Sequence, residues 1–175
     1  MTVRNIVLCG DNKLRVKSEK VKKITKSVKT LITDMFDTLE AAGGIGLAAP
    51  QIGIAKAVII IDLTKAEKDT KMVLINPVIQ KKYGPKEIFA EGCLSIPEIY
   101  GDVIRHTIID LIYENADGKL CKMKDVSGIA ARVIQHEVDH LNGVLYIDLL
   151  EPEEKKKIFS DVENIIKKTK LSLLK

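Results

Sequence analysis

The amino-acid sequence predicts an α+β fold, in which short and mostly antiparallel strands surround a central helix, with further helices near the N-terminus and C-terminus. Three observations support this class. Apolar residues recur at helical spacing in three segments, near 18–42, 127–141 and 152–170. Runs rich in Ile and Val lie at 56–63 and 72–80, and a predicted hairpin surrounds 116–118. With 175 residues and no repeat or linker, residues 1–175 are expected to form a single domain.

The N-terminal helix is predicted from one continuous apolar side. Ser18 is the expected N-cap, with Glu19 just inside the helix. The pair Gly43-Gly44 is expected to end the helix, since glycine readily adopts the conformation that follows a last helical turn. A loop rich in Gly and Ala continues to Gly53. The apolar side consists of Val21, Ile24, Val28, Leu31, Ile32, Met35, Phe36 and Leu39.

The extended segments differ in how they are expected to pair. Asn76-Pro77 indicates that the strand at 72–80 lies at a sheet edge or is broken there, because proline has no N–H for a neighbouring strand. Residues 87–95 are expected to be short and extended. Residues 107–115 and 119–124 are expected to form a hairpin around Gly118. Residues 144–147 are expected to form another short extended piece.

Two further helices have recognisable ends. The second is expected to be capped by Asp125 or Ser127 and to end at Asn142-Gly143. The third begins at Pro152, a favoured first position, and is followed by two Glu in its first turn. Lys167, Lys168 and Lys170 suit the negative end of its helix dipole.

Composition narrows the class of protein. Three Cys without paired spacing argue against a disulfide framework and favour a reducing cytoplasm. No apolar run reaches membrane-span length, and the first 20 residues lack the apolar core of a secretory signal, so a membrane role is not expected.

Residues 1–30 hold nine Lys or Arg against two acidic residues, which indicates a solvated face or contact with an anionic surface such as ribosomal RNA. No aromatic residue is interleaved with these lysines, so DNA is not an expected partner.

The strongest chemical signal is the sequence His136-Glu137-Val138-Asp139-His140 on the second predicted helix. A spacing of four residues places both imidazoles on one helix face, where they can bind one ion. Glu137 lies about 100° around the helix from His136, where its carboxylate can reach a water without binding the metal. The alternative is a polar exposed face, but two of the three His in the chain lie here, in an otherwise apolar helix.

A metal ion at this helix needs a third protein ligand, and the residues alone leave several candidates. These are Cys9, Cys93, Cys121 and His106. Cys93 follows Gly92, which allows close backbone approach. Two His and one Cys would leave one position for water, the arrangement of catalytic rather than structural zinc sites.

The segment Gly44 to Ala49 formally matches a dinucleotide-binding pattern, but it follows a helix and Pro50 interrupts any helix after it. It is either a tight connection or a backbone edge that pairs with an extended peptide. Gln51 at its end could donate to a developing oxyanion.

The segments 44–51 (GIGLAAPQ), 91–95 (EGCLS) and 135–141 (QHEVDHL) occur in this order along the chain. Together they closely resemble the motifs of peptide deformylases, and the likeness to the bacterial type with a C-terminal helix extends over essentially the whole chain. The resemblance implies a metal-dependent hydrolase that removes the N-formyl group from the N-terminal formyl-methionine of newly synthesised polypeptides and releases formate.

The resemblance also assigns roles to individual positions. For the metal and the chemistry it implies Cys93, His136 and His140 as metal ligands, Glu137 as catalytic acid/base, and Gln51 with the Leu94 backbone N–H as oxyanion donors. For the substrate it implies Ile45 and Gly46 beside the peptide backbone, Glu91 and Gly92 framing the site, and Phe89, Ile129 and Val133 lining the methionine pocket.

The expected cofactor is one divalent ion, Fe(II) in the cell, with Zn, Ni or Co as substitutes. Tyr100-Gly101 stands where some relatives carry Arg, and Arg132 lies near a pocket that is apolar in others. Both leave the preference beyond the first substrate residue open.

Two other functions fit parts of the pattern. A metalloendopeptidase could use the same His-Glu-x-x-His helix to cleave internal peptide bonds. A basic module on the ribosome surface could carry a structural metal, which would need a fourth protein ligand. Ribosome contact through the lysine-bearing C-terminal helix is also compatible with catalysis.

Overall fold

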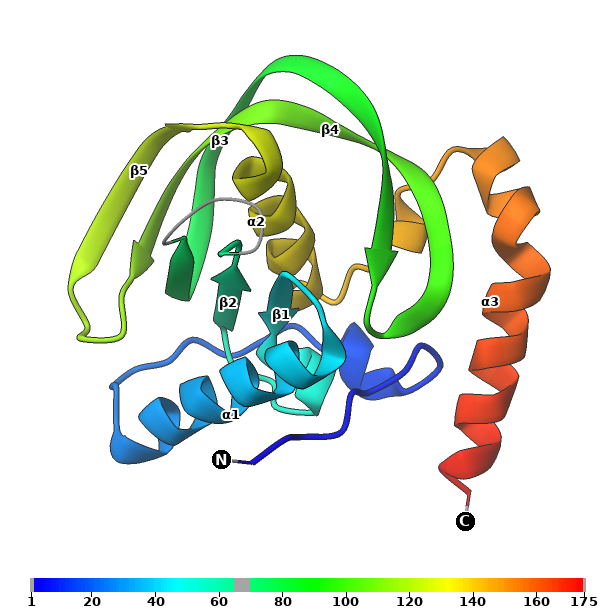
Figure 1. The fold of residues 1–175 in the computed structure, drawn as a ribbon, viewed down its shortest axis with the longest axis horizontal. Coiled ribbons are helices and arrows are strands. Elements are labelled where there is room, and N and C mark those ends of the chain that lie inside the picture. The colour runs from blue at the N-terminus through cyan, green and yellow to red at the C-terminus, as the bar shows by residue number, and fades with distance from the viewer. Residues whose placement is uncertain (1, 65–69, 175) are drawn as a thin grey trace.

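The computed structural model describes residues 2–64 and 70–174, and the expected α+β class is confirmed (Figure 1). Five antiparallel strands form a sheet in the order β1-β2-β3-β4-β5. The strands are β1 (Gly46–Ala48), β2 (Val58–Asp62), β3 (Lys71–Cys93), β4 (Ile96–Glu114) and β5 (Leu120–Val126). The helices are α1 (Lys26–Ala42), α2 (Gly128–Leu141) and α3 (Pro152–Ser172), with short 3-10 turns η1 (Asn12–Arg15), η2 (Ala49–Ile52) and η3 (Tyr146–Asp148).

Strands β3 and β4 form one long bent hairpin, so the expectation of short strands is wrong for these two. The expected piece at 72–80 and residues 87–93 of the expected piece at 87–95 are parts of the 23-residue strand β3, which lies between β2 and β4 and not at an edge, and residues 94–95 form the turn after it. The expected break at Asn76-Pro77 is present as a register shift between Ile75 and Val78. Further shifts follow along the hairpin, which arches over α2 (Figure 1).

The N-terminal helix begins later than expected, at Lys26 after Thr25, and Ser18 is not its N-cap. Residues 18–21 instead bond to distant parts of the chain. The Ser18 N–H donates to the carbonyl of Leu141 at 2.8 Å, and the Val21 N–H donates to the Asn76 side chain at 2.8 Å. These tertiary hydrogen bonds take the place of a first helical turn. The predicted end is confirmed, since Gly43 adopts a left-handed φ of 68°.

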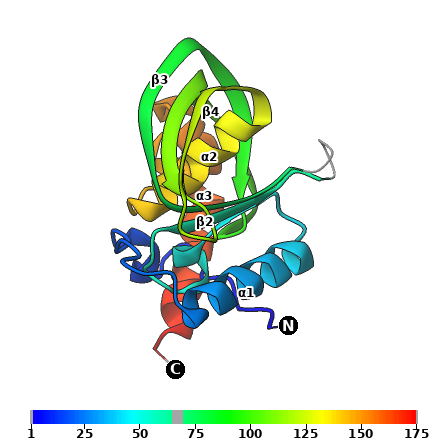
Figure 2. The same ribbon diagram turned by 90° about the vertical axis from the view of Figure 1, so that its left-hand side faces the viewer.

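Helix α2 lies in the concavity of the sheet, beneath the β3–β4 arch (Figures 1 and 2). Ser127 occupies its N-cap position without a side-chain hydrogen bond, and the helix ends at Asn142 as predicted. Strand β2 is buried on both faces, which explains its unbroken apolar sequence. Ile59 and Ile61 belong to the core cluster that includes α2, whereas Val58 and Ile60 belong to the cluster that includes α1.

Helix α3 has the predicted start at Pro152 and packs against β4 (Figure 1). The segment before it differs from expectation, because residues 146–148 form the 3-10 turn η3 and not an extended piece. The buried Tyr146 side chain of this turn donates to the Ile99 carbonyl at 2.9 Å, which fixes the turn against β4. None of the helices in the described part of the chain combines the length and apolar content needed to span a bilayer.

Candidate metal centre

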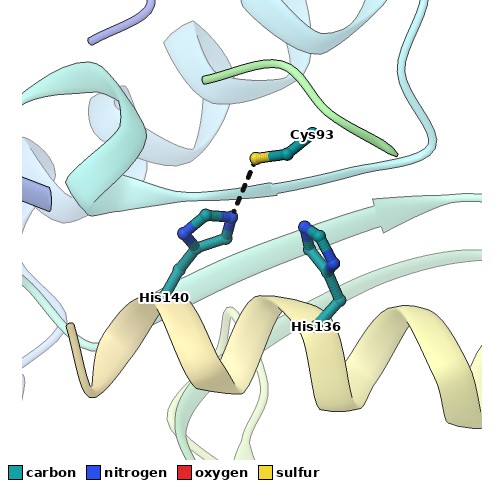
Figure 3. Close-up of side chains that lie close together, drawn as sticks. All are labelled: Cys93, His136 and His140. Carbon is teal, nitrogen blue, oxygen red and sulfur yellow. Dashed lines mark hydrogen bonds between the residues drawn. The ribbon is translucent and has the colours of Figure 1, made fainter. Parts of the chain in front are cut away.

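Helix α2 and the end of β3 bring one thiol and two imidazoles together (Figure 3). His136 and His140 lie one turn apart on α2 and point to the same side, toward Cys93. The potential ligand atoms of the three residues all lie within 4.8 Å of one another. The Cys93 Sγ is 3.2 Å from the Nε2 of His140, and the two imidazole centroids are 5.0 Å apart. This separation suits simultaneous contact with one small ion.

The chemistry of these donors fits a divalent transition metal. Thiolate and imidazole are ligands that zinc, iron, nickel and cobalt accept. Among residues 2–64 and 70–174, no fourth His, Cys, Asp or Glu joins the group. The other candidate ligands are not part of this group: Cys9 is buried in the core cluster of Leu14 and Tyr146, Cys121 bonds the Lys119 carbonyl, and His106 faces the Gly84 carbonyl. A set of three protein donors is typical of catalytic sites.

Glu91 fixes the orientation of one imidazole. Its Oε2 accepts a hydrogen bond from the Nδ1 of His136 at 3.0 Å, which leaves Nε2 of that ring for a ligand. Burial by itself raises the pKa of Glu91, but hydrogen bonds from His136 and Arg105 outweigh it and lower this pKa to about 2. Glu91 is therefore ionised at neutral pH. The Nδ1 of His140 is buried without a hydrogen-bond partner among the described residues, so the two rings are held differently.

Glu137 is a buried carboxylate beside the three donors. The residue is 4% exposed, and its Oε2 has no hydrogen-bond partner within the described part of the chain. Burial raises the pKa of Glu137 to about 7, against the opposing charges of His136 and Arg105. A side chain at Gly46 would place its Cβ 2.5 Å from Glu137 Oε1, so glycine is required where β1 passes this carboxylate. Such a carboxyl group is poised for proton transfer near neutral pH.

This raised pKa predicts how the stability of the metal-free protein depends on pH. Between the ordinary value of 4.5 and about 7, the folded carboxyl keeps a proton that the unfolded chain has released. Stability contributed by Glu137 therefore falls as the pH rises through this range, by up to about 3 kcal/mol. Urea unfolding of the chelator-treated protein and its Glu137→Gln variant at pH 5 and 7.5 should show the variant gaining relative stability at the higher pH. An equal difference at both pH values would contradict the prediction.

The amide of Gln51 is held in a defined orientation. Its Oε1 accepts the Ala48 N–H at 2.8 Å, so its Nε2 points the other way. That Nε2 lies 3.4 Å from both Cys93 Sγ and Ser95 Oγ. Leu94 lies in the turn after Cys93. Gln51 thus presents a donor beside the thiol, where it could also reach a substrate oxygen.

A cavity of about 460 Å³ opens beside this centre. Each residue to which the family resemblance assigns a role lines it except His140. Phe89 and Ile45 are 59% and 38% exposed and lie at its rim. The predicted residues that line it are Ile45, Gly46, Gln51, Phe89, Glu91, Gly92, Cys93, Leu94, Ile129, Val133, His136 and Glu137.

Sequence reasoning missed two residues that support the site. Arg105 is 5% exposed and makes two hydrogen bonds to Glu91 and one to Asp139. Tyr146 stacks on His136 with centroids 6.2 Å apart. Arg105 lies in an ordinary strand and Tyr146 in a short connecting segment, so neither has a local sequence pattern that indicates this role.

A His-Glu-x-x-His helix beneath a bent antiparallel hairpin, with a thiol as third donor and a buried carboxylate beside it, is the arrangement of a metal-dependent hydrolase. The model of the polypeptide deformylase family matches residues 3–156. The chain belongs to this family, whose members are metal-dependent hydrolases.

Individual relatives agree with this assignment. The chain is 41% identical to a peptide deformylase of Brachyspira hyodysenteriae over 93% of this chain and 89% of the relative. It is 46% identical to peptide deformylase 1 of Clostridium acetobutylicum over 88% of this chain and 99% of the relative. Among solved structures, a Plasmodium falciparum peptide deformylase superposes with a TM-score of 0.90 at 36% identity, covering 95% of this chain and 98% of that one.

Proposed function

We propose that this chain removes the formyl group from the N-terminal formyl-methionine of nascent polypeptides and releases formate. The observation that carries the proposal is the buried Glu137 carboxylate, whose Oε2 has no hydrogen-bond partner among the described residues, at the wall of a cavity that Cys93 and His136 also line, with His140 completing the group of donors. Hydrolysis of an amide needs a group that takes a proton from water and returns one to the leaving amine. Glu137 is suited to both steps.

We propose Cys93, His136 and His140 as the metal ligands. A divalent ion held there supplies Lewis acidity, which polarises a carbonyl and acidifies water. Glu137 accepts the proton of the attacking water and then delivers it to the amine that leaves. Gln51 Nε2 and the Leu94 backbone N–H donate to the oxygen that gains negative charge.

The substrate is proposed to lie along β1. This strand is at the edge of the described sheet, with β2 on only one side, so an extended peptide can pair beside Ile45 and Gly46. Glu91 and Gly92 frame the reacting end of the substrate. Phe89, Ile129 and Val133 supply apolar surface for the methionine side chain.

The ion is proposed to be Fe(II) in the cell, with Zn, Ni or Co as substitutes, because all of them accept thiolate and imidazole. The protein is proposed to act in the cytoplasm, as one domain over residues 1–175. Its free thiols are compatible with a reducing compartment.

A contact between α3 and the ribosome is a further part of the proposal. The exposed side of α3 carries several lysines together with Phe159, which is 64% exposed. Lysines can contact the phosphates of ribosomal RNA. Co-sedimentation with ribosomes should weaken when Lys167, Lys168 and Lys170 are replaced by Gln, and unchanged sedimentation would remove this contact from the proposal.

The deciding assay is formate release from formyl-Met peptides by protein purified without oxygen. Formate should appear, stop when a chelator removes the metal, and return when Fe(II), Ni or Co is added. Elemental analysis should find one ion per chain. An unformylated peptide containing internal methionine is the control. Cleavage of that control without formate release would support an endopeptidase, and a bound metal without either activity would support a structural site.

A further inference from the structure

Arg132 is a mostly buried cation that none of the proposed catalytic steps uses. It lies one helical turn before His136 on α2, and its side chain is 15% exposed. Its Nη1 donates to Glu91 Oε1 at 2.8 Å and to the Val103 carbonyl at 3.2 Å, and its Nη2 donates to the Glu87 carbonyl at 2.9 Å. A buried guanidinium with this many bonds has one defined position.

The hydrogen bond from Arg132 fills the last acceptor position of the Glu91 carboxylate. Oε1 accepts from Arg105 Nε at 2.7 Å and from Arg132 Nη1. Oε2 accepts from Arg105 Nη2 at 2.9 Å and from His136 Nδ1 at 3.0 Å. Four donors fill the acceptor sites of a carboxylate. Glu91 cannot turn without breaking bonds to both arginines, so its hold on His136 depends on both.

The other side of Arg132 faces the cavity wall. Its guanidinium carbon lies 5.4 Å from the centroid of the Phe89 ring, within cation–π range. Phe89 is exposed at the rim, and Glu87, whose carbonyl Arg132 binds, belongs to the same strand. Arg132 therefore connects the rim of the pocket to the carboxylate that orients His136.

We propose that Arg132 is a positioning residue that couples the pocket for the first substrate side chain to the orientation of His136, through Glu91. The inference rests on the proposed function for its assignment of the pocket and the metal ligand. The charges support it, since Arg105 and Arg132 balance Glu91 and Asp139 in one connected cluster. Loss of Arg132 leaves two carboxylates, Glu91 and Asp139, against Arg105 alone and removes one of the four donors that hold Glu91 beside the ring.

Co(II)-loaded protein provides a test, because the visible absorption of Co(II) reports the geometry of its ligands. In Arg132→Met, the Co(II) affinity, measured by competition with a chelator, should fall about tenfold, the lower end of the range for groups that orient a ligand. The absorption bands should shift, and KM for a formyl-Met peptide should rise. Arg132→Lys keeps the charge without the planar fork and should recover only part of each change.

Two controls separate the coupled effects. Phe89→Leu removes the ring but keeps the hydrogen bonds of Arg132, so KM should rise while the Co(II) spectrum stays unchanged. Arg4→Met removes an arginine that is paired with Asp34 outside the cavity. It should alter neither KM nor the Co(II) spectrum. Thermal unfolding of each variant shows whether the fold is kept.

The proposal is overturned if Arg132→Met changes KM alone, with Co(II) affinity and spectrum as in the wild type. It is equally overturned if Arg132→Lys matches the wild type in every measurement, because the forked hydrogen bonds would then be unnecessary. Wild-type protein that releases no formate would refute the proposed function. The Co(II) measurements would still decide whether Arg132 orients His136.

Discussion

Replacement of Glu137 by Gln is expected to lower kcat for formate release by roughly 10²–10⁴-fold, the usual contribution of one acid/base group. Gln has nearly the same shape as Glu but cannot take a proton from water at neutral pH. Glu137 Oε2 has no hydrogen-bond partner among the described residues, so the substitution breaks no bond at that atom. The loss should therefore appear in the chemistry, with the fold and the metal kept.

Stopped-time formate assays combined with elemental analysis of the same sample measure this effect. Glu40→Gln, an exposed substitution on α1, is the matched control and should retain full activity. Metal content in Glu137→Gln should equal that of the wild type. If the metal-loaded Glu137→Gln protein released formate at the wild-type rate, Glu137 would have no part in the mechanism.

Replacement of Cys93 by Ser is expected to weaken metal binding by more than the 10–100-fold typical of substitutions that only orient a ligand. A hydroxyl is a poorer ligand than a thiolate for the metals that this donor set suits. It also remains protonated at neutral pH, whereas a thiol near a metal loses its proton. Activity should fall with metal occupancy when the metal is limiting.

Cys121→Ser is the matched control, because Cys121 is also a partly exposed thiol but lies outside the group of three donors, with its Sγ bonded to the Lys119 carbonyl. Competition with a chromophoric chelator gives the affinity of each variant. In the Co(II)-loaded wild type and Cys121→Ser, a sulfur-to-metal absorption band should be present, and it should be absent in Cys93→Ser. Retention of that band and of native affinity in Cys93→Ser would exclude the thiol as a ligand.

The sequence by itself determined the elements whose signals are local. The apolar sides of the helices, the Gly that ends α1 and the Pro that begins α3 all lie within a few residues of what they specify. The spacing of His136 and His140 belongs to this group, because a helix places residues four apart on one face. The motif at 91–95 similarly indicated Cys93 through its resemblance to a family.

Tertiary contacts decided what local signals could not. Residues 18–25 have a helical apolar pattern, but hydrogen bonds to Leu141 and Asn76 hold residues 18 and 21 in a non-helical conformation. The length of β3 and β4 depends on pairing between segments far apart in the chain, and bulges allow that pairing to bend around α2.

The support of the site also depended on the tertiary structure. Arg105, Arg132 and His136 meet at Glu91 from β4 and α2, and no one-dimensional pattern marks residues whose shared partner is a single carboxylate. Burial makes that meeting necessary, because an ionised carboxylate away from water must be surrounded by donors. The sequence thus determined which atoms are suited to bind a metal, and folding decided how they are held.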